Sequence, residues 1–219
     1  MVSQATVQAR INFGFSKAAK IVGSTVQWYR PSGSGPAIGG ANWIGTLPVL
    51  FDTAADMLQK APSRYAKDDD WYGAFDNTTV VVGDYFTDPQ LGTFFVAAIE
   101  YLKPARLVRC NRVVNVTRPG SAQPGPAYYG GDIAADEEVL FTGWPASIVQ
   151  GTKGEKGETT VPGDIRLPWF NVILPLSIPV QVKTADIFTD DQAIPIVYTV
   201  SSAEQTELGW RFTAGAALP

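Results

Sequence analysis

Histidine is absent from the 219-residue sequence. This absence removes the commonest general base, the base that partners most serine and cysteine nucleophiles, and the commonest metal ligand. Histidine-dependent catalytic triads and zinc sites are therefore excluded. The single cysteine, Cys110, cannot form an internal disulfide, and we interpret it as a small buried apolar residue.

Charged residues and long apolar runs are also scarce. Only 17% of the residues are charged and the formal net charge is −4, which disfavours a protein whose whole surface binds nucleic acid. No apolar run approaches the length of a membrane span, and the first residues lack the apolar core of a signal peptide. We expect a protein without a membrane anchor that is made and kept in the cytosol, or carried out only as part of something larger.

What is present is a pattern of short elements. Residues 11–23 and 47–60 place apolar side chains at three- and four-residue spacing, which predicts two helices, the second with Pro48 in its first turn. From Trp71 onward, nine short apolar runs alternate with Gly, Pro, Asp and Asn, which is typical of all-β sandwiches and barrels. The predicted class is mainly β, with a short helical element at the N-terminus.

The segment 119–132 is rich in Pro and Gly and predicts a loop between two modules, residues 1–118 and residues 133–219. One internal echo favours two small sandwich-like or barrel-like modules of similar structure. Residues 83–88 (GDYFTD) resemble residues 185–190 (ADIFTD), and each is followed by a turn and an apolar strand. The match is short, so coincidence remains an equal alternative.

No motif predicts a catalytic, cofactor or metal site. Asp68, Asp70 and Gly73 fit three positions of a calcium loop, but Thr79 occupies the position that needs a bidentate glutamate. The glycine-rich loop around residues 32–45 lacks the strand, helix and acidic residue of a dinucleotide site. Adjacent carboxylates such as Glu137 and Glu138 would point to opposite faces of a strand. We expect a protein that is not an enzyme.

One charged feature stands out, a basic stripe without any acidic residue across residues 103–118. Its local charge is +5, against −9 for the rest of the chain. Outward arginines are common on strands, but such a stripe could also dock an acidic neighbouring subunit or meet DNA passing through a ring. The stripe consists of Lys103, Arg106, Arg109, Arg112 and Arg118.

Several motifs together resemble virion proteins of tailed bacteriophages and prophages of proteobacteria. The motifs are VQWYRP, WYGAFD, GDYFTDPQLGTFFVAAIEYLKPARLVRCNRVVNVTRPG, TGWPASIVQGTKGEKGE and the closing ADIFTDDQ…YTVSSAEQTELGWRFTA. The resemblance implies a structural subunit that forms a multi-copy, homo-oligomeric ring on the tail tube, hub or baseplate, with other virion proteins as partners. A head-to-tail connector is the alternative within this class.

An alternative of another class is a receptor-binding or carbohydrate-binding module at the tail tip, because exposed tryptophan rings can stack on sugars. Any of six tryptophans could serve in this way: Trp28, Trp43, Trp71, Trp144, Trp169 and Trp210.

Overall fold

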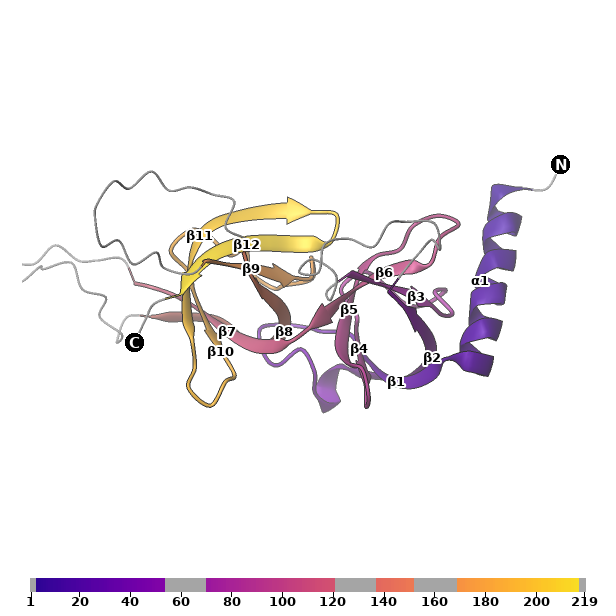
Figure 1. Cartoon of the computed structure of the whole chain (residues 1–219), viewed down its shortest axis with the longest axis horizontal. Coiled ribbons are helices and arrows are strands. Elements are labelled where there is room, and N and C mark those ends of the chain that lie inside the picture. The colour runs from indigo at the N-terminus through magenta and orange to yellow at the C-terminus, as the bar shows by residue number, and fades with distance from the viewer. Residues whose placement is uncertain (1–2, 54–69, 121–136, 152–168, 217–219) are drawn as a thin grey trace, which may run out of the picture.

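A computed structural model describes residues 3–53, 70–120, 137–151 and 169–216. The fold is mainly β, as predicted, with an α-helix at the N-terminus followed by two closed barrels of six antiparallel strands. The barrels lie side by side along the long axis of the molecule (Figure 1), and the helix α1 (Gln4–Val22) stands at the end formed by the first barrel.

The two barrels have the same topology. The strands of the first barrel are hydrogen-bonded in the order β1-β2-β3-β6-β5-β4, and β4 returns to β1. Those of the second follow β7-β8-β9-β12-β11-β10, and β10 returns to β7. Each strand of the first barrel therefore has a counterpart in the second barrel, so that β1 corresponds to β7 and β6 to β12. The first barrel comprises β1 (Ser24–Tyr29), β2 (Trp43–Asp52), β3 (Asp70–Ala74), β4 (Tyr85–Asp88), β5 (Gly92–Ala98) and β6 (Ala105–Cys110). The second comprises β7 (Arg112–Arg118), β8 (Glu138–Gln150), β9 (Trp169–Leu174), β10 (Ile187–Asp190), β11 (Val197–Thr206) and β12 (Gly209–Ala216).

The sequence echo lies on counterpart strands, because residues 83–88 lead into and form β4 and residues 185–190 lead into and form β10. The residue before each aspartate has a left-handed backbone, with φ of 93° at Gly83 and 74° at Ala185. The same two backbone hydrogen bonds close each hairpin: Gly83 N to Val96 O and Val96 N to Asp84 O in the first barrel, Ala185 N to Val200 O and Val200 N to Asp186 O in the second. The echo is therefore one visible part of a structural repeat.

The first predicted helix is present and longer than expected. It begins at Gln4 rather than residue 11, because Ser3 caps it by accepting a hydrogen bond from the Thr6 amide. Two further hydrogen bonds, from the Tyr101 hydroxyl to the Gln4 carbonyl and from the Leu102 amide to Gln8 Oε1, hold α1 against the first barrel.

The second predicted helix, 47–60, is wrong for its first part, because residues 43–52 form strand β2; residues 54–60 lie outside the described residues. Leu47, Val49 and Phe51 alternate toward the interior of the barrel, and a run this short fits both strand and helix periods. Pro48 is tolerated because β2 has only β1 beside it there: the pairing of β2 with β3 begins at Leu50.

The boundary between the modules differs from the predicted loop at 119–132. Strand β7 already belongs to the second barrel, so only Asn111 separates the barrels along the chain. The Asn111 side chain accepts from the Ile148 amide and donates to the Ile148 carbonyl, which fixes the crossing point to β8. Residues 121–132 of the predicted loop lie outside the described residues, between β7 and β8.

The apolar core continues from one barrel into the other. Phe94 and Val96 of β5 point into the first barrel, whereas the alternating Phe95 and Ala97 belong to the cluster that fills the second barrel. Tyr85 of β4 joins that cluster and donates a 2.8 Å hydrogen bond to the Pro145 carbonyl. The barrels are therefore packed as one unit.

Candidate functional site

The residues of the predicted basic stripe are divided between the two barrels. Lys103 lies in the loop before β6, Arg106 and Arg109 lie on β6, and Arg112 and Arg118 lie on β7. All but Arg109 form ion pairs with carboxylates of the same chain, and Arg109 forms none with the described residues. The pairs are Lys103 with Glu100, Arg106 with Asp70 and Glu207, Arg112 with Asp190, and Arg118 with Asp186. Most of the positive charge of the stripe is therefore neutralised within the molecule.

Arg118 has a counterpart that the sequence analysis missed. Arg118 donates from Nε and Nη2 to the two oxygens of Asp186, at 2.8 and 2.9 Å. In the first barrel, Arg30 donates from the same two atoms to Asp84, at 2.8 Å each. Each arginine lies at the end of the first strand of its barrel, Arg30 directly after β1 and Arg118 as the last residue of β7, and each precedes a proline. The repeated Arg-Pro and the echoed aspartate together were the available signal.

We call these two ion pairs the arginine clamps. In each clamp the aspartate also accepts a backbone amide of its own turn, from Val81 in the first barrel and from Lys183 in the second. The clamp of the first barrel has one further donor, Trp28 Nε1, at 2.9 Å from Asp84. Hydrogen bonding to the buried carboxylates raises the pKa of both arginines. The clamps close each barrel between its first and fourth strands, which is a structural role.

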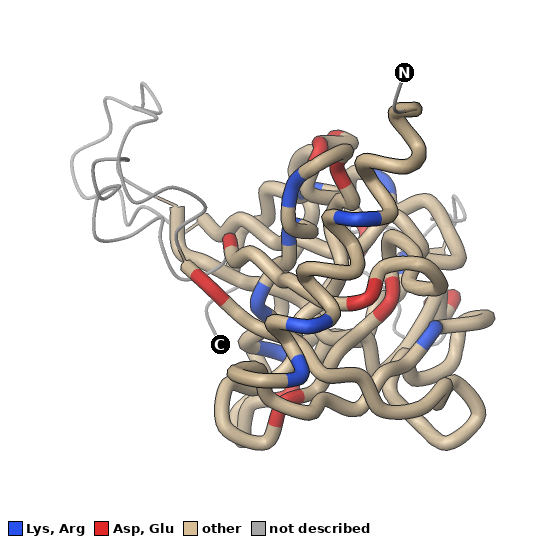
Figure 2. The backbone as a smooth tube through the Cα atoms, turned by 90° about the vertical axis from the view of Figure 1, so that its right-hand side faces the viewer, with Lys and Arg blue, Asp and Glu red and all other residues tan. Residues whose placement is uncertain are grey.

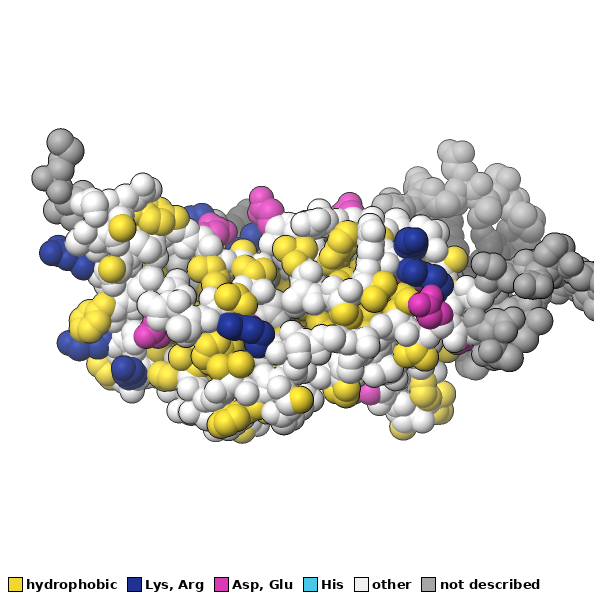
Figure 3. Space-filling view, turned by 180° about the vertical axis from the view of Figure 1, so that it is seen from behind, with side chains coloured by type: hydrophobic (Ala, Val, Ile, Leu, Met, Phe, Trp, Pro, Cys, Tyr) yellow, Lys and Arg dark blue, Asp and Glu magenta, His cyan; other side chains and the backbone are white. Residues whose placement is uncertain are grey.

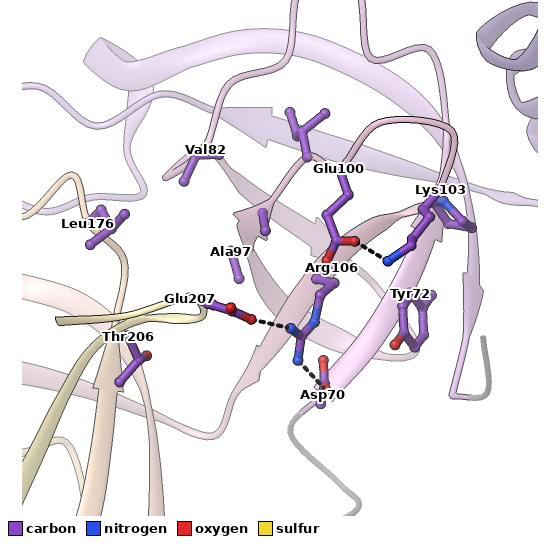
Figure 4. Close-up of a pocket in the computed structure, with 13 residues that line it drawn as sticks. Asp70, Tyr72, Val82, Ala97, Glu100, Lys103, Arg106, Leu176, Thr206 and Glu207 are labelled. Carbon is purple, nitrogen blue, oxygen red and sulfur yellow. Dashed lines mark hydrogen bonds and ion pairs between the residues drawn. The ribbon is translucent and has the colours of Figure 1, made fainter. Parts of the chain in front are cut away.

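A hollow of about 1200 Å³ opens between the two barrels (Figure 4). Its wall in the first barrel comes from β3 and from the segment between β5 and β6, and the turn of the β11–β12 hairpin borders it from the second barrel. Arg106 points between two carboxylates in this hollow, Asp70 at 2.9 Å and Glu207 at 3.6 Å. Glu207 comes from the hairpin, so Arg106 joins the two barrels by charge.

The charges of the hollow are engaged with one another. Burial alone would lower the pKa of Arg106, but the hydrogen bond from Arg106 to Asp70 raises it above the usual value. The pKa of Lys103 is raised by its hydrogen bond to Glu100. The pairs of Lys103 with Glu100 and of Arg106 with Asp70 lie within the first barrel. The pair of Arg106 with the exposed Glu207 crosses to the second barrel and contributes little stability, because water screens it.

The glycine-rich loop between β1 and β2 packs on the second barrel. Trp144 Nε1 donates to the Gly35 carbonyl at 3.0 Å, and the Ala37 amide donates to the Gly143 carbonyl at 3.2 Å. Gly143 has a φ of 68°, and a Cβ there would lie about 3.0 Å from the side chain of Pro36. Gly143 of β8 therefore allows the loop to approach the second barrel closely.

Within the ranges that the structure describes, no three acidic or cysteine side chains lie close enough together to hold a metal ion. Of the calcium-loop residues, Asp70 and Gly73 lie on β3, and Asp68 is outside the described residues. No helix in the described part of the chain is long and apolar enough to cross a membrane.

The tryptophans differ sharply in exposure. Trp28 and Trp144 are buried, Trp71 and Trp210 are partly buried against the cores, and Trp169 is partly buried. Trp43, at the start of β2, is 51% exposed and donates from Nε1 to Gln27 Oε1 at 2.9 Å. Among the six candidates for sugar stacking, Trp43 is the one whose ring is widely accessible.

Comparison of the chain with protein-family models, with curated proteins and with solved structures gives no match. The functional argument therefore rests on the residues and on the geometry of the fold.

Proposed function

We propose that this chain is a structural subunit of a tailed-phage virion, which assembles as a multi-copy ring on the tail tube, hub or baseplate. The observation that carries the proposal is the packing of two barrels of identical topology around a shared apolar core. Such a block has a defined shape and can present the same contacts in every copy of a symmetric assembly.

Exposed apolar side chains supply possible contacts to neighbours. Phe13 and Ile21 of α1 are exposed at one end of the molecule, and Ile194 is exposed in the β10–β11 turn of the second barrel. The face seen in Figure 3 carries apolar side chains over both barrels. Apolar residues at separate places suit a subunit with several neighbours.

The tail location is favoured over the head-to-tail connector by the state of the basic stripe. A connector that guides DNA would benefit from free cations along its channel. Four of the five stripe residues already pair with carboxylates of the chain. Arg109 forms no ion pair with the described residues, so it is the residue of the stripe best able to bind an acidic neighbouring subunit.

The carbohydrate-binding alternative now rests on Trp43, because its ring is widely exposed. Glycan-array binding that disappears in Trp43→Ala, and persists in the buried-residue control Trp28→Phe, would favour this alternative over a scaffold role.

The proposal is tested by counting copies. Virions of the encoding phage or induced prophage are purified, heads and tails are separated, and the protein is quantified per particle by mass spectrometry. A fixed number that matches a ring and stays with the tails supports the proposal. Recovery with heads alone would move the protein to the connector, and absence from virions would overturn the structural role.

A further inference from the structure

The outer face of α1 has no partner within the described residues. Ala19 is buried against the barrel, and the side of the helix turned away from it carries three cations and two apolar side chains. Phe13 is 66% exposed and Ile21 78%, and Lys17 Nζ lies 5.5 Å from the centre of the Phe13 ring. We define the outer face of α1 as Arg10, Phe13, Lys17, Lys20 and Ile21.

The chain is electrically asymmetric along its length. Residues 1–23 contain three basic and no acidic residues, a charge of +3. The described residues of the second barrel contain 4 basic and 7 acidic residues, a charge of −3. Seen from the α1 end (Figure 2), basic positions follow the helix without acidic ones, and the second barrel lies at the other end of the long axis (Figure 1).

We propose that the outer face of α1 binds the second barrel of another copy of this chain, head to tail; this inference rests on the proposed role as a repeated subunit. The second barrel has three acidic residues, Glu137, Glu138 and Asp191, that form no ion pair with other described residues, and their charge is opposite to that of α1. The two regions lie at opposite ends of the molecule, so they cannot meet within a single copy. Phe13 and Ile21 supply the apolar contact that charge alone would not. A head-to-tail contact repeats from copy to copy and closes into a ring when its rotation permits.

An anionic membrane is the other surface that a basic helix can meet. Interfacial helices bury a purely apolar face and keep their cations on the opposite face. In α1 the face opposite the cations is packed against β2 and β3, and the free face mixes cations with apolar residues. The mixed composition favours a protein surface.

The test uses sedimentation velocity of the full chain at low salt and at about 1 M salt, where charges are screened beyond about 3 Å. We expect the wild type to form larger species at low salt that dissociate at high salt. The triple variant R10E/K17E/K20E should associate at least on the order of tenfold more weakly. A second variant, Phe13→Ser with Ile21→Ser, tests the apolar contact with the charges unchanged, and circular dichroism confirms that both variants fold.

A charge swap identifies the partner surface. Glu137, Glu138 and Asp191 are acidic residues of the second barrel that form no ion pair with other described residues. The variant E137K/E138K/D191K should also associate weakly, and an equimolar mixture with R10E/K17E/K20E should restore larger species. Restoration in the mixture supports a contact between α1 and the second barrel.

Three outcomes would overturn the inference. Association that R10E/K17E/K20E retains would place the contact elsewhere and leave the virion role intact. A wild type that stays monomeric at every salt concentration would remove the contact between copies, and copy counting in particles would still test the virion role separately. A monomer that binds phosphatidylserine vesicles through the same three cations would assign α1 to a membrane surface.

Discussion

At the scale of single residues, the arginine clamps are the most constrained polar features. Asp84 is fully buried and accepts four hydrogen bonds, whereas Arg30 keeps 39% of its side chain exposed. We expect Asp84→Ala to lower the free energy of unfolding by about 2–4 kcal/mol, because it removes charge-assisted bonds and leaves Trp28 Nε1 without its acceptor. Urea denaturation followed by tryptophan fluorescence measures this loss.

The repeat supplies the comparison for this prediction. Asp186→Ala should cost less than Asp84→Ala, since its clamp lacks the tryptophan donor. Asp191→Ala, an exposed aspartate, should change stability by less than about 0.5 kcal/mol. Equal stability of all three variants would mean that the clamps do not stabilise the barrels.

The ionisation of Asp190 makes the free energy of unfolding depend on pH. Burial alone would raise the pKa of its carboxyl, but hydrogen bonds from the Gln192 side chain, the Ile196 amide and the Tyr198 hydroxyl outweigh burial and hold the pKa below the usual value. The unfolded chain binds this proton near pH 4, before the folded protein does. The stability that ionised Asp190 contributes is therefore present above pH 4 and lost as the pH falls through the lower pKa of the folded state.

Asp190→Asn should remove this dependence. Its free energy of unfolding should fall less steeply than that of the wild type when urea denaturation is repeated from pH 5 downward. Asp191→Asn, the exposed neighbour, should keep the slope of the wild type. If the free energy of unfolding of Asp190→Asn falls with pH as steeply as that of the wild type, other carboxyl groups cause the acid sensitivity.

At the scale of elements, the junction between α1 and β1 depends on one glycine. A Cβ at Gly23 would lie 2.5 Å from the Ala19 carbonyl oxygen and 2.6 Å from that of Val49, both of which are backbone atoms. We expect Gly23→Ala to destabilise the protein by about 1–3 kcal/mol, because α1 must shift away from β2. Thermal unfolding followed by circular dichroism provides the measurement.

Gly14→Ala is the matched control in the same helix. A Cβ at Gly14 meets no atom within 4 Å, and alanine is the better helix former, so this variant should gain about 0.5–1 kcal/mol. If Gly23→Ala lowers the stability and Gly14→Ala raises it, glycine is required at position 23 because of the close approach of backbone atoms and not because of backbone freedom. A Gly23→Ala variant as stable as the wild type would contradict the packing argument.

The elements also show what the sequence can predict. The α1 helix and the β-rich remainder follow from periodicity, because each exposes one face and buries the other. Strand β2 was predicted as a helix because Leu47, Leu50 and Phe51 fit the helical period when Val49 is ignored. The clamps were missed because their partners are 54 and 68 residues apart, and ion pairing at that distance depends on the fold.

At the scale of the whole molecule, the echo of residues 83–88 in residues 185–190 was the clue that predicted the duplication, but the boundary between the modules was missed. The run of residues 105–117 appears continuous in sequence, yet it changes barrel at Asn111. A turn-rich segment usually marks a boundary between modules, but here residues 119–132 follow the first strand of the second barrel. The hydrogen bonds between Asn111 and Ile148 allow the chain to cross without a linker.

The shared core predicts that the two barrels unfold together. Tyr85 points out of the first barrel toward Trp144, with ring centroids 6.2 Å apart, whereas the adjacent Phe86 points inward toward Phe75. We expect the wild type to show one calorimetric transition whose calorimetric and van't Hoff enthalpies agree. Tyr85→Ala should split this transition, because it removes the ring and the hydrogen bond to Pro145 that join the barrels.

Phe86→Ala is the control for coupling, since it removes a ring of similar size from the interior of the first barrel. It should lower the melting temperature, at a cost of about 3–5 kcal/mol, and keep a single transition, because the contact between the barrels is intact. A single transition in both variants would show that the coupling does not depend on Tyr85. Two transitions in the wild type would mean that the shared core does not make the barrels one cooperative unit, and the argument for a single block that repeats in an assembly would lose its support.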